Sequence, residues 1–267
     1  MIQENAHSAL LIGELPRLPD PLLEQEGLVL EKDEQGRISA AYLTSDGLKH
    51  GESRLFYPDE KIKANLFYDR GMLHGPSLFY SEAQVLLTET LYVQGKKEGN
   101  VKYFYLSGQL ASLQRFQEGI PHGLQEYWYE DGTIKSSIPY EQGAIHGEVR
   151  LFWESGQPKR SAQYVKGARE GWDRLWNEKG ILIEEGEFLA GHPIHTHRHF
   201  FSNGQKKEEF FYHTPLRFDV KKWDASGVLL REGVYASDLS YTERTFEQPQ
   251  KTIVRKGYWD GQRLCWK

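Results

Sequence analysis

The chain has 267 residues, of which 39% are hydrophobic and 13% aromatic, and its formal net charge is −5. This charge gives no support to nucleic-acid binding or to attraction by anionic membranes. The single cysteine, Cys265, excludes a disulfide framework and a cysteine-based zinc site within this sequence. No apolar run approaches the roughly 20 residues of a membrane span. We expect a cytoplasmic protein, or a periplasmic one if a signal peptide belongs to it.

Glycine recurs along the chain with a fixed period of 24 residues. The anchor positions are Gly51, Gly75, Gly99, Gly123, Gly147 and Gly171. A second series precedes the next anchor position by four residues: Gly71, Gly95, Gly119, Gly143, Gly167 and Gly191. A fixed period of this length predicts a repeat architecture, in which each unit buries its surface against its neighbours.

Each unit predicts a β-hairpin. In the copy that begins at Gly147, an apolar run ends at Glu154-Ser155-Gly156, and a second run ends at Gly167. Both stops have the turn chemistry of hairpins, and glycine comes too often for helices. The fold class that follows is all-β, an elongated stack of antiparallel β-hairpins with the 24-residue period.

In chain order, we expect an N-terminal arm or cap at residues 1–27, repeats at 28–236, and an insertion with a capping half-repeat at 237–267. The first hairpin is degenerate around Gly36, and His195 replaces glycine at the seventh anchor position. Residues 238–253 break the period, so we expect a non-repeating loop there.

Two aromatic series predict the core. One lies five residues past the anchor position: Phe56, Phe104, Trp128, Phe152, Trp176 and Phe200. The other lies in the second strand: Tyr68, Tyr92, Phe116, Tyr140, Tyr164, Phe188 and Tyr212. Equivalent positions stack in a repeat protein, so we expect rings to pack on rings along both series.

The unit resembles the MORN repeat in its bacterial variant form. The matching copies are His74-Gly75, His122-Gly123 with Tyr127-Trp128-Tyr129, and His146-Gly147 with Phe152-Trp153. The resemblance covers roughly residues 33–235. It implies scaffolding, dimerisation or lipid contact, and for the bacterial variants it implies antitoxins or immunity proteins that neutralise a toxin or secreted effector. It implies no catalytic residues.

Histidines give the sharpest alternative hypothesis. His195, His197 and His199 alternate onto one face of a strand and could ligate a metal, but no carboxylate is obviously placed to complete a site. A solvated strand edge is the competing interpretation. The histidines that precede an anchor glycine recur regularly, so we expect them to hydrogen-bond a turn carbonyl. They are His50, His74, His122 and His146, with Glu98 and Glu170 in the same slot.

The less regular ring positions, four and six residues past the anchor, are the candidates for partner binding. We expect them to point opposite to the core ladder, although twist of the sheet could also pack them. The insertion supplies two further candidates. The candidate partner-binding residues are Tyr103, Tyr105, Tyr127, Tyr129, Trp153, Tyr241 and Phe246.

We therefore expect a non-catalytic module, without cofactor or metal, that binds and neutralises a protein toxin or effector. Nucleic-acid and membrane partners are not expected. The alternative is a MORN scaffold that binds lipid or self-assembles, since end strands could pair with another copy. An enzyme that uses the histidine cluster is a third hypothesis; we found no P-loop, hydrolase or zinc-peptidase motif.

Overall fold

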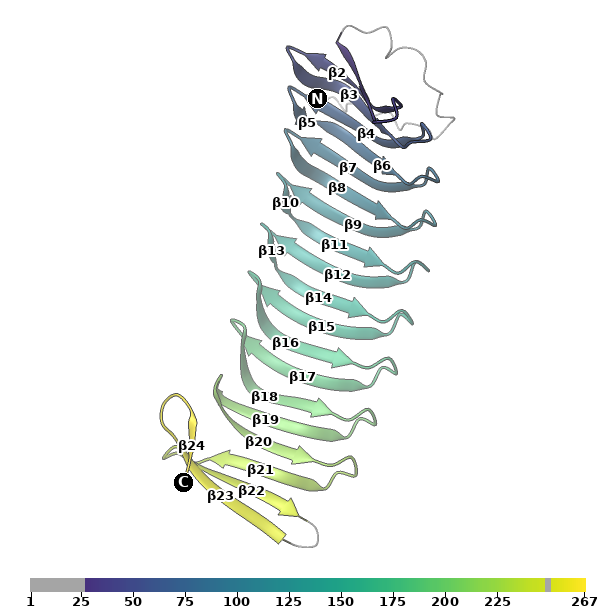
Figure 1. The fold of residues 1–267 in the computed structure, drawn as a ribbon. Coiled ribbons are helices and arrows are strands. Elements are labelled where there is room, and N and C mark those ends of the chain that lie inside the picture. The colour runs from purple at the N-terminus through teal and green to yellow at the C-terminus, as the bar shows by residue number, and fades with distance from the viewer. Residues whose placement is uncertain (1–26, 248–250) are drawn as a thin grey trace, which may run out of the picture.

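The computed structural model describes residues 27–247 and 251–267, and this part of the chain forms one antiparallel sheet of 24 strands with no helix (Figure 1). Strands follow one another across the sheet in sequence order, so the chain is a meander of hairpins. The prediction of an all-β stack of hairpins is confirmed. The expected arm at residues 1–27 lies outside the described residues except for Gly27.

The strands of the first half of the sheet are short and evenly spaced. Their bounds are β1 (Leu28–Lys32), β2 (Ile38–Ser45), β3 (Leu48–Phe56), β4 (Ile62–Asp69), β5 (Met72–Leu73), β6 (Gly75–Tyr80), β7 (Leu86–Val93), β8 (Lys96–Phe104), β9 (Leu110–Gln117), β10 (Ile120–Pro121), β11 (Gly123–Trp128) and β12 (Ile134–Glu141).

The second half continues the same arrangement. Its strands are β13 (Ala144–Ile145), β14 (Gly147–Phe152), β15 (Pro158–Val165), β16 (Ala168–Trp176), β17 (Leu182–Leu189), β18 (His192–Phe200), β19 (Lys206–Thr214), β20 (Arg217–Trp223), β21 (Leu229–Tyr235), β22 (Ser240–Glu247), β23 (Lys251–Trp259) and β24 (Leu264–Trp266).

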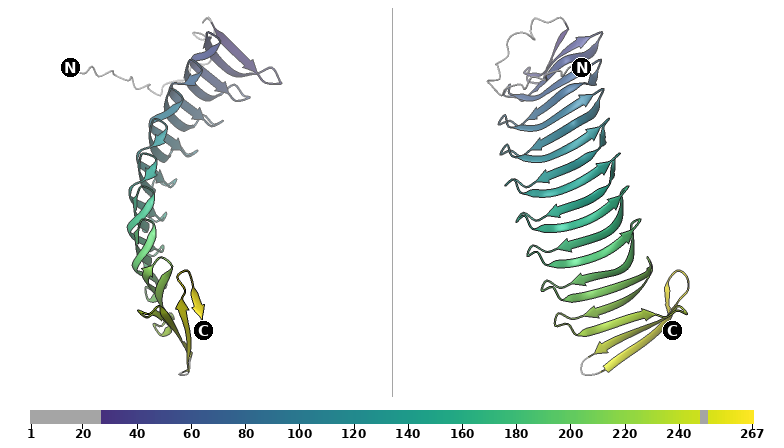
Figure 2. Two further views of the ribbon diagram at one scale, coloured as in Figure 1. Left: turned by 90° about the vertical axis from the view of Figure 1, so that its left-hand side faces the viewer. Right: turned by 180° about the vertical axis from the view of Figure 1, so that it is seen from behind.

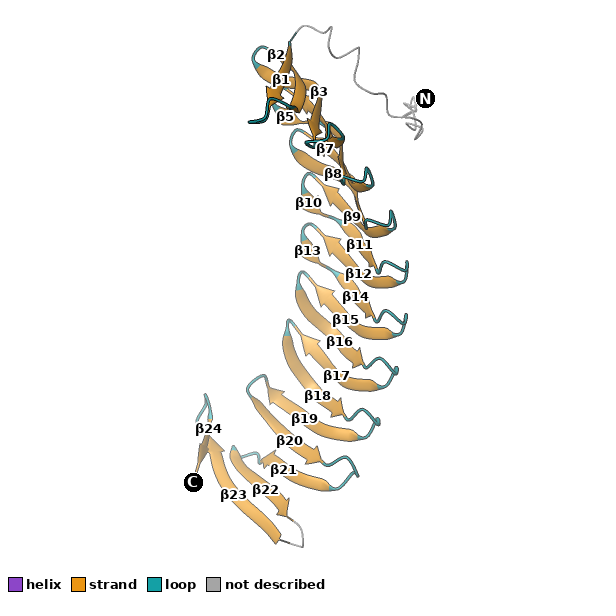
Figure 3. Ribbon diagram, turned by 45° about the vertical axis from the view of Figure 1, so that its right-hand side comes forward, coloured by secondary structure: helices purple, strands orange, loops and turns teal. Residues whose placement is uncertain are grey.

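The sheet is a single bowed layer, as the edge-on view shows (Figure 2). Its turns line two long edges, and the last strands, β22 to β24, swing away from the stack (Figure 3). The described part of the chain contains no helix that is long and apolar enough to cross a membrane.

One long edge consists of two-residue turns, which we call the glycine-turn edge. Both central residues have positive φ, as in Arg70-Gly71 (φ 47° and 82°) and Gln142-Gly143 (49° and 83°). This is the type I′ geometry, which matches the twist of the strands and favours glycine. The turn glycine also donates its N–H to the preceding repeat: the N–H of Gly143 bonds the carbonyl of Pro121 at 3.0 Å. The second glycine series therefore closes each turn and joins it to its neighbour.

The buried core lies on one face of the sheet, which we call the packed face. Its centre is the position two residues past the anchor, and seven successive copies are buried: Ser53, Ser77, Val101, Gln125, Val149, Asp173 and His197. Val220 continues this buried row in the next hairpin, because His197 and Val220 both lie opposite Phe210. Within residues 27–247 and 251–267 no second layer covers the sheet, so the larger side chains on either side along the strands must shield this row.

The expected ring-on-ring core is therefore wrong in its centre, although its aromatic residues flank it. Tyr164 lies opposite Gly147 and belongs to the packed face, next to the buried pair Val149 and Ala162. No aromatic ring except the imidazole of His197 occupies this central row.

The expectation of a non-repeating loop at residues 238–253 is also wrong. Described residues of this segment form β22 and the start of β23, which pair in continuous register from Ser240 opposite Tyr258 to Glu247 opposite Lys251. The sequence departs from the 24-residue period there, but β22 and β23 still pair as regular antiparallel strands.

Candidate interaction surfaces

Three of the proposed binding residues link neighbouring repeats along the second long edge, which we call the midpoint-turn edge. The hydroxyl of Tyr105 donates to the carbonyl of Trp128 at 2.8 Å. Tyr129 donates in the same way to Phe152 at 3.0 Å, and the indole N–H of Trp153 bonds the next repeat at 3.2 Å. These side chains therefore hold the stack together, whatever else they contact.

Tyr103 and Tyr127 lie on the packed face. Tyr103 is paired with Ser112 and lies on the same side of the sheet as Phe116, because the register has the same parity at both pairs. The expectation that these residues point away from the aromatic ladder is wrong, since the bulge comes only after this position. Burial raises the pKa of Tyr127 above its ordinary value.

The structure brings two of the proposed residues together. Tyr105 and Tyr127 line a hollow of about 330 Å³, together with Trp128 and Lys135. Tyr241 and Phe246 lie far along the stack, in β22. Tyr241 is only 4% exposed, so it supports the C-terminal core and offers little surface to a partner.

The three histidines of β18 make separate contacts. The Nδ1 atom of His195 lies 2.8 Å from a carboxylate oxygen of Glu187, and Nδ1 of His199 lies 3.1 Å from Glu208. Among the residues that the structure describes, no group of three His, Cys, Asp or Glu side chains could hold a metal ion.

His197 is a core residue. Its Nε2 lies 2.8 Å from the carbonyl oxygen of Glu187, and its ring packs edge-on against Phe188 and Tyr212 at 4.9 and 4.8 Å. Burial lowers its pKa below the ordinary value, so the neutral ring with its proton on Nε2 fits the site. The ring lies directly over Gly186, where any Cβ would collide with it.

The polar residues that precede the anchor glycines contact turns, but through a different group from the one expected. The carboxylate of Glu98 accepts the backbone N–H of Glu118 at 2.8 Å, and Glu170 accepts that of Ala190 at the same distance. The Nδ1 of His74 is in a similar position toward Gln94 at 3.4 Å. In these three copies the side chain accepts a turn N–H and does not donate to a turn carbonyl. The Nδ1 atoms of His50 and His146 lie instead 3.2 Å from a carboxylate oxygen of Asp69 and 3.4 Å from one of Glu141.

Sequence reasoning missed an exposed apolar surface on the opposite face of the sheet, which we call the open face. Ten hydrophobic side chains there are each between 36% and 54% exposed. They lie in two adjacent rows near the glycine-turn edge, as the strand registers show. This apolar band consists of Leu48, Met72, Leu91, Val93, Ile120, Leu124, Val165, Trp172, Leu189 and Phe211.

A signal for part of the band was present in the sequence. Leu48, Met72 and Ile120 follow the turn glycine at the same repeat position. Apolar residues that recur at an exposed turn indicate an interaction surface, because the core of the stack does not need them at that position.

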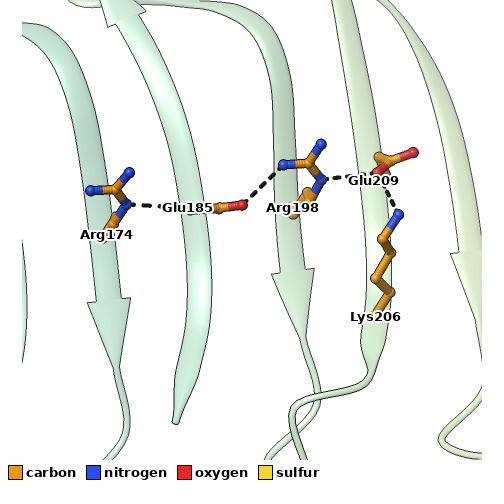
Figure 4. Close-up of polar contacts among 5 residues, drawn as sticks. All are labelled: Arg174, Glu185, Arg198, Lys206 and Glu209. Carbon is orange, nitrogen blue, oxygen red and sulfur yellow. Dashed lines mark hydrogen bonds and ion pairs between the residues drawn. The ribbon is translucent and has the colours of Figure 1, made fainter. Parts of the chain in front are cut away.

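A ladder of charges runs beside the band on the same face. The guanidinium of Arg198 bonds Glu185 and Glu209, both at 3.0 Å, while Arg174 lies 3.7 Å from Glu185 and Lys206 lies 2.9 Å from Glu209 (Figure 4). The guanidinium of Arg174 also stacks on the ring of Trp172, 4.7 Å from its centroid. Thus the charge ladder and the apolar band meet at β16.

Two members of the ladder, Arg198 and Glu209, are held in their charged form. Partial burial opposes ionisation of Glu209, but hydrogen bonds from Lys206 and Arg198 outweigh it and lower the pKa of this carboxyl. Hydrogen bonds to Glu185 and Glu209 raise the pKa of Arg198. The open face therefore presents an apolar band with a fixed charged border, an arrangement suited to a protein surface with a matching pattern.

The comparison with known families agrees with this architecture. The family model described as MORN repeat variant matches residues 49–70, 97–118, 121–142 and 145–166. Each matched segment begins two residues before an anchor glycine. The search of curated proteins found no match to the chain.

Proposed function

Because this chain is a MORN-repeat protein of the variant type, we propose that it is a non-catalytic module that binds a protein partner through the open face. The observation that carries the proposal is the apolar band. A soluble protein rarely leaves so many large apolar side chains exposed in adjacent rows unless another surface covers them. The charge ladder beside the band gives the contact a polar border and a defined register.

The partner that we propose is a toxin or secreted effector, which the module neutralises by binding. This part rests on the resemblance to bacterial variant MORN proteins. The net charge of −5 also favours association with a basic protein surface. Binding at the band would leave the inter-repeat hydrogen bonds of the two edges undisturbed.

The test begins with a tagged pull-down from lysate of the source cell, read by mass spectrometry, followed by affinity measurement with the purified partner. The variant Leu124→Lys/Val165→Lys places two charges in the apolar band, and we expect it to lower the affinity at least tenfold. Leu106→Lys is the matched control, since Leu106 is 70% exposed at a midpoint turn.

Three other outcomes are informative. If both variants retain full affinity, the band is not the interface. If Tyr127→Ala weakens binding and the band variant does not, the partner docks on the packed face. If the protein instead floats with vesicles that contain phosphatidylserine and captures no protein, the proposal fails in favour of a lipid-binding scaffold.

A further inference from the structure

A cavity lies at the C-terminal end of the packed face, on the opposite side of the sheet from the apolar band. Its volume is about 370 Å³, which falls within the range of small-molecule sites. The sheet contributes residues of β20, β21 and β22, and the β23–β24 hairpin, which rises at the side of the stack, contributes Trp259 and residues 262–264 (Figure 1). The cavity therefore forms where the chain departs from the regular stack.

Aromatic rings form its walls. The ring centroids of Tyr235 and Tyr241 are 4.6 Å apart, and Trp259 meets Tyr235 edge-on at 6.2 Å. Tyr241 is fixed because its ring lies across Gly233, where an added Cβ would come within 1.8 Å of the hydroxyl oxygen. Burial raises the pKa of Tyr241 to about 12, so it stays neutral. The walls are thus preorganised for a flat ring.

Three side chains of the lining carry N–H donor groups. Arg231, Gln262 and Arg263 line the cavity, and no acidic side chain does. Arg231 is neutralised by its ion pair with the buried carboxylate of Glu243. Arg263 differs, because its side chain is 82% exposed and its nearest carboxylate, Asp260, is 3.7 Å away. Its guanidinium is therefore available to a carboxylate in two-point geometry.

We propose that this cavity binds a small aromatic carboxylate, with its ring packed against Tyr235 and Trp259 and its carboxylate on Arg263. The site is independent of the proposed protein interface, because it uses the other face and different strands. Apolar walls with a few convergent polar groups are the usual composition of such sites.

The test uses indole-3-acetate as the probe and follows the assigned indole ¹H–¹⁵N signal of Trp259 in the full-length protein by NMR. We expect a saturable shift of this signal. Arg263→Gln should weaken binding at least fivefold. Arg244 is an exposed arginine on the open face of β22, so the control variant Arg244→Gln should leave the affinity unchanged. Retained chemical shifts elsewhere in each variant show that the fold is intact.

Uncharged indole separates the two parts of the proposal. In the original protein, we expect indole to bind more weakly than indole-3-acetate. In Arg263→Gln, we expect the two probes to bind with equal affinity. The proposal is overturned if Trp259 shows no saturable shift at millimolar probe. It is also overturned if indole and indole-3-acetate bind equally well, or if Arg263→Gln and Arg244→Gln bind the probe alike.

Discussion

Substituting Gly186 with alanine would remove His197 from the core. A Cβ on Gly186 would lie 2.2 Å from Nδ1 and 2.5 Å from Cε1 of the imidazole, so the ring must leave its position. It would lose the bond to the carbonyl of Glu187, a contribution of about 1 kcal/mol, and its packing against two aromatic rings, about 2 kcal/mol more. We expect Gly186→Ala to lower the free energy of unfolding by about 3 kcal/mol.

The interaction can be isolated with a double-mutant cycle measured by urea unfolding. His197→Ala already lacks the ring, so adding Gly186→Ala should then cost about 0 kcal/mol and give a coupling energy of about 3 kcal/mol. If Gly186→Ala is equally costly in both backgrounds, with coupling below about 0.5 kcal/mol, the collision with His197 is not the cause and the reasoning is refuted.

His195 occupies an anchor position with a φ of 57°, so His195→Gly should raise the unfolding free energy by roughly 1 kcal/mol in urea, despite losing the exposed ion pair with Glu187. A lower stability would show that this contact dominates. His197 has a pKa depressed below 6.5 in the folded state, so the unfolded chain binds the proton more tightly and stability falls as the pH drops from 6.5 toward the folded value. Urea unfolding at pH 7.5 and 5 should show a smaller loss for His197→Gln; an equal loss would place the effect elsewhere. Tyr129→Phe removes the hydrogen bond to Phe152 and should cost about 1 kcal/mol, and an unchanged midpoint would show that water replaces it fully.

The hairpin stack could be predicted from sequence because turns carry their own chemistry. Every type I′ turn favours glycine, so the glycine period stays visible in the sequence even where the other residues of the repeat vary. The same logic extends to His195, which departs from the glycine pattern but keeps the left-handed backbone of the anchor position. Histidine in place of glycine at position 195 therefore adds backbone strain but leaves the positive φ unchanged.

The buried row could not be predicted, since it mixes Ser, Val, Gln, Asp and His. One polar member replaces main-chain pairing beside the bulged anchor: the side-chain amide of Gln125 bonds both the N–H and the carbonyl of Arg115. A hydrophobicity pattern cannot reveal a position whose requirement is sometimes a hydrogen bond and sometimes a methyl group.

The candidate surfaces were harder for a related reason. Aromatic residues at the midpoint turns were expected at an interface, but Tyr105 and Tyr129 use their hydroxyls within the stack. The sequence could not show this, because an exposed ring and a ring that bonds the next repeat obey the same spacing. Only the distance to the neighbouring carbonyl separates them.

Beyond the pairing of their strands, several neighbouring repeats are joined by a backbone bond at the glycine-turn edge and a side-chain bond at the midpoint-turn edge, as with Gly143 to Pro121 and Tyr129 to Phe152. Both ties span about one repeat, so neither one depends on how many units lie above or below. A whole unit can therefore be removed or duplicated without breaking the pattern of its neighbours, and the length of the molecule becomes a heritable quantity that changes in fixed steps. The number of repeats therefore sets, in fixed steps, the length of the surface that the sheet presents.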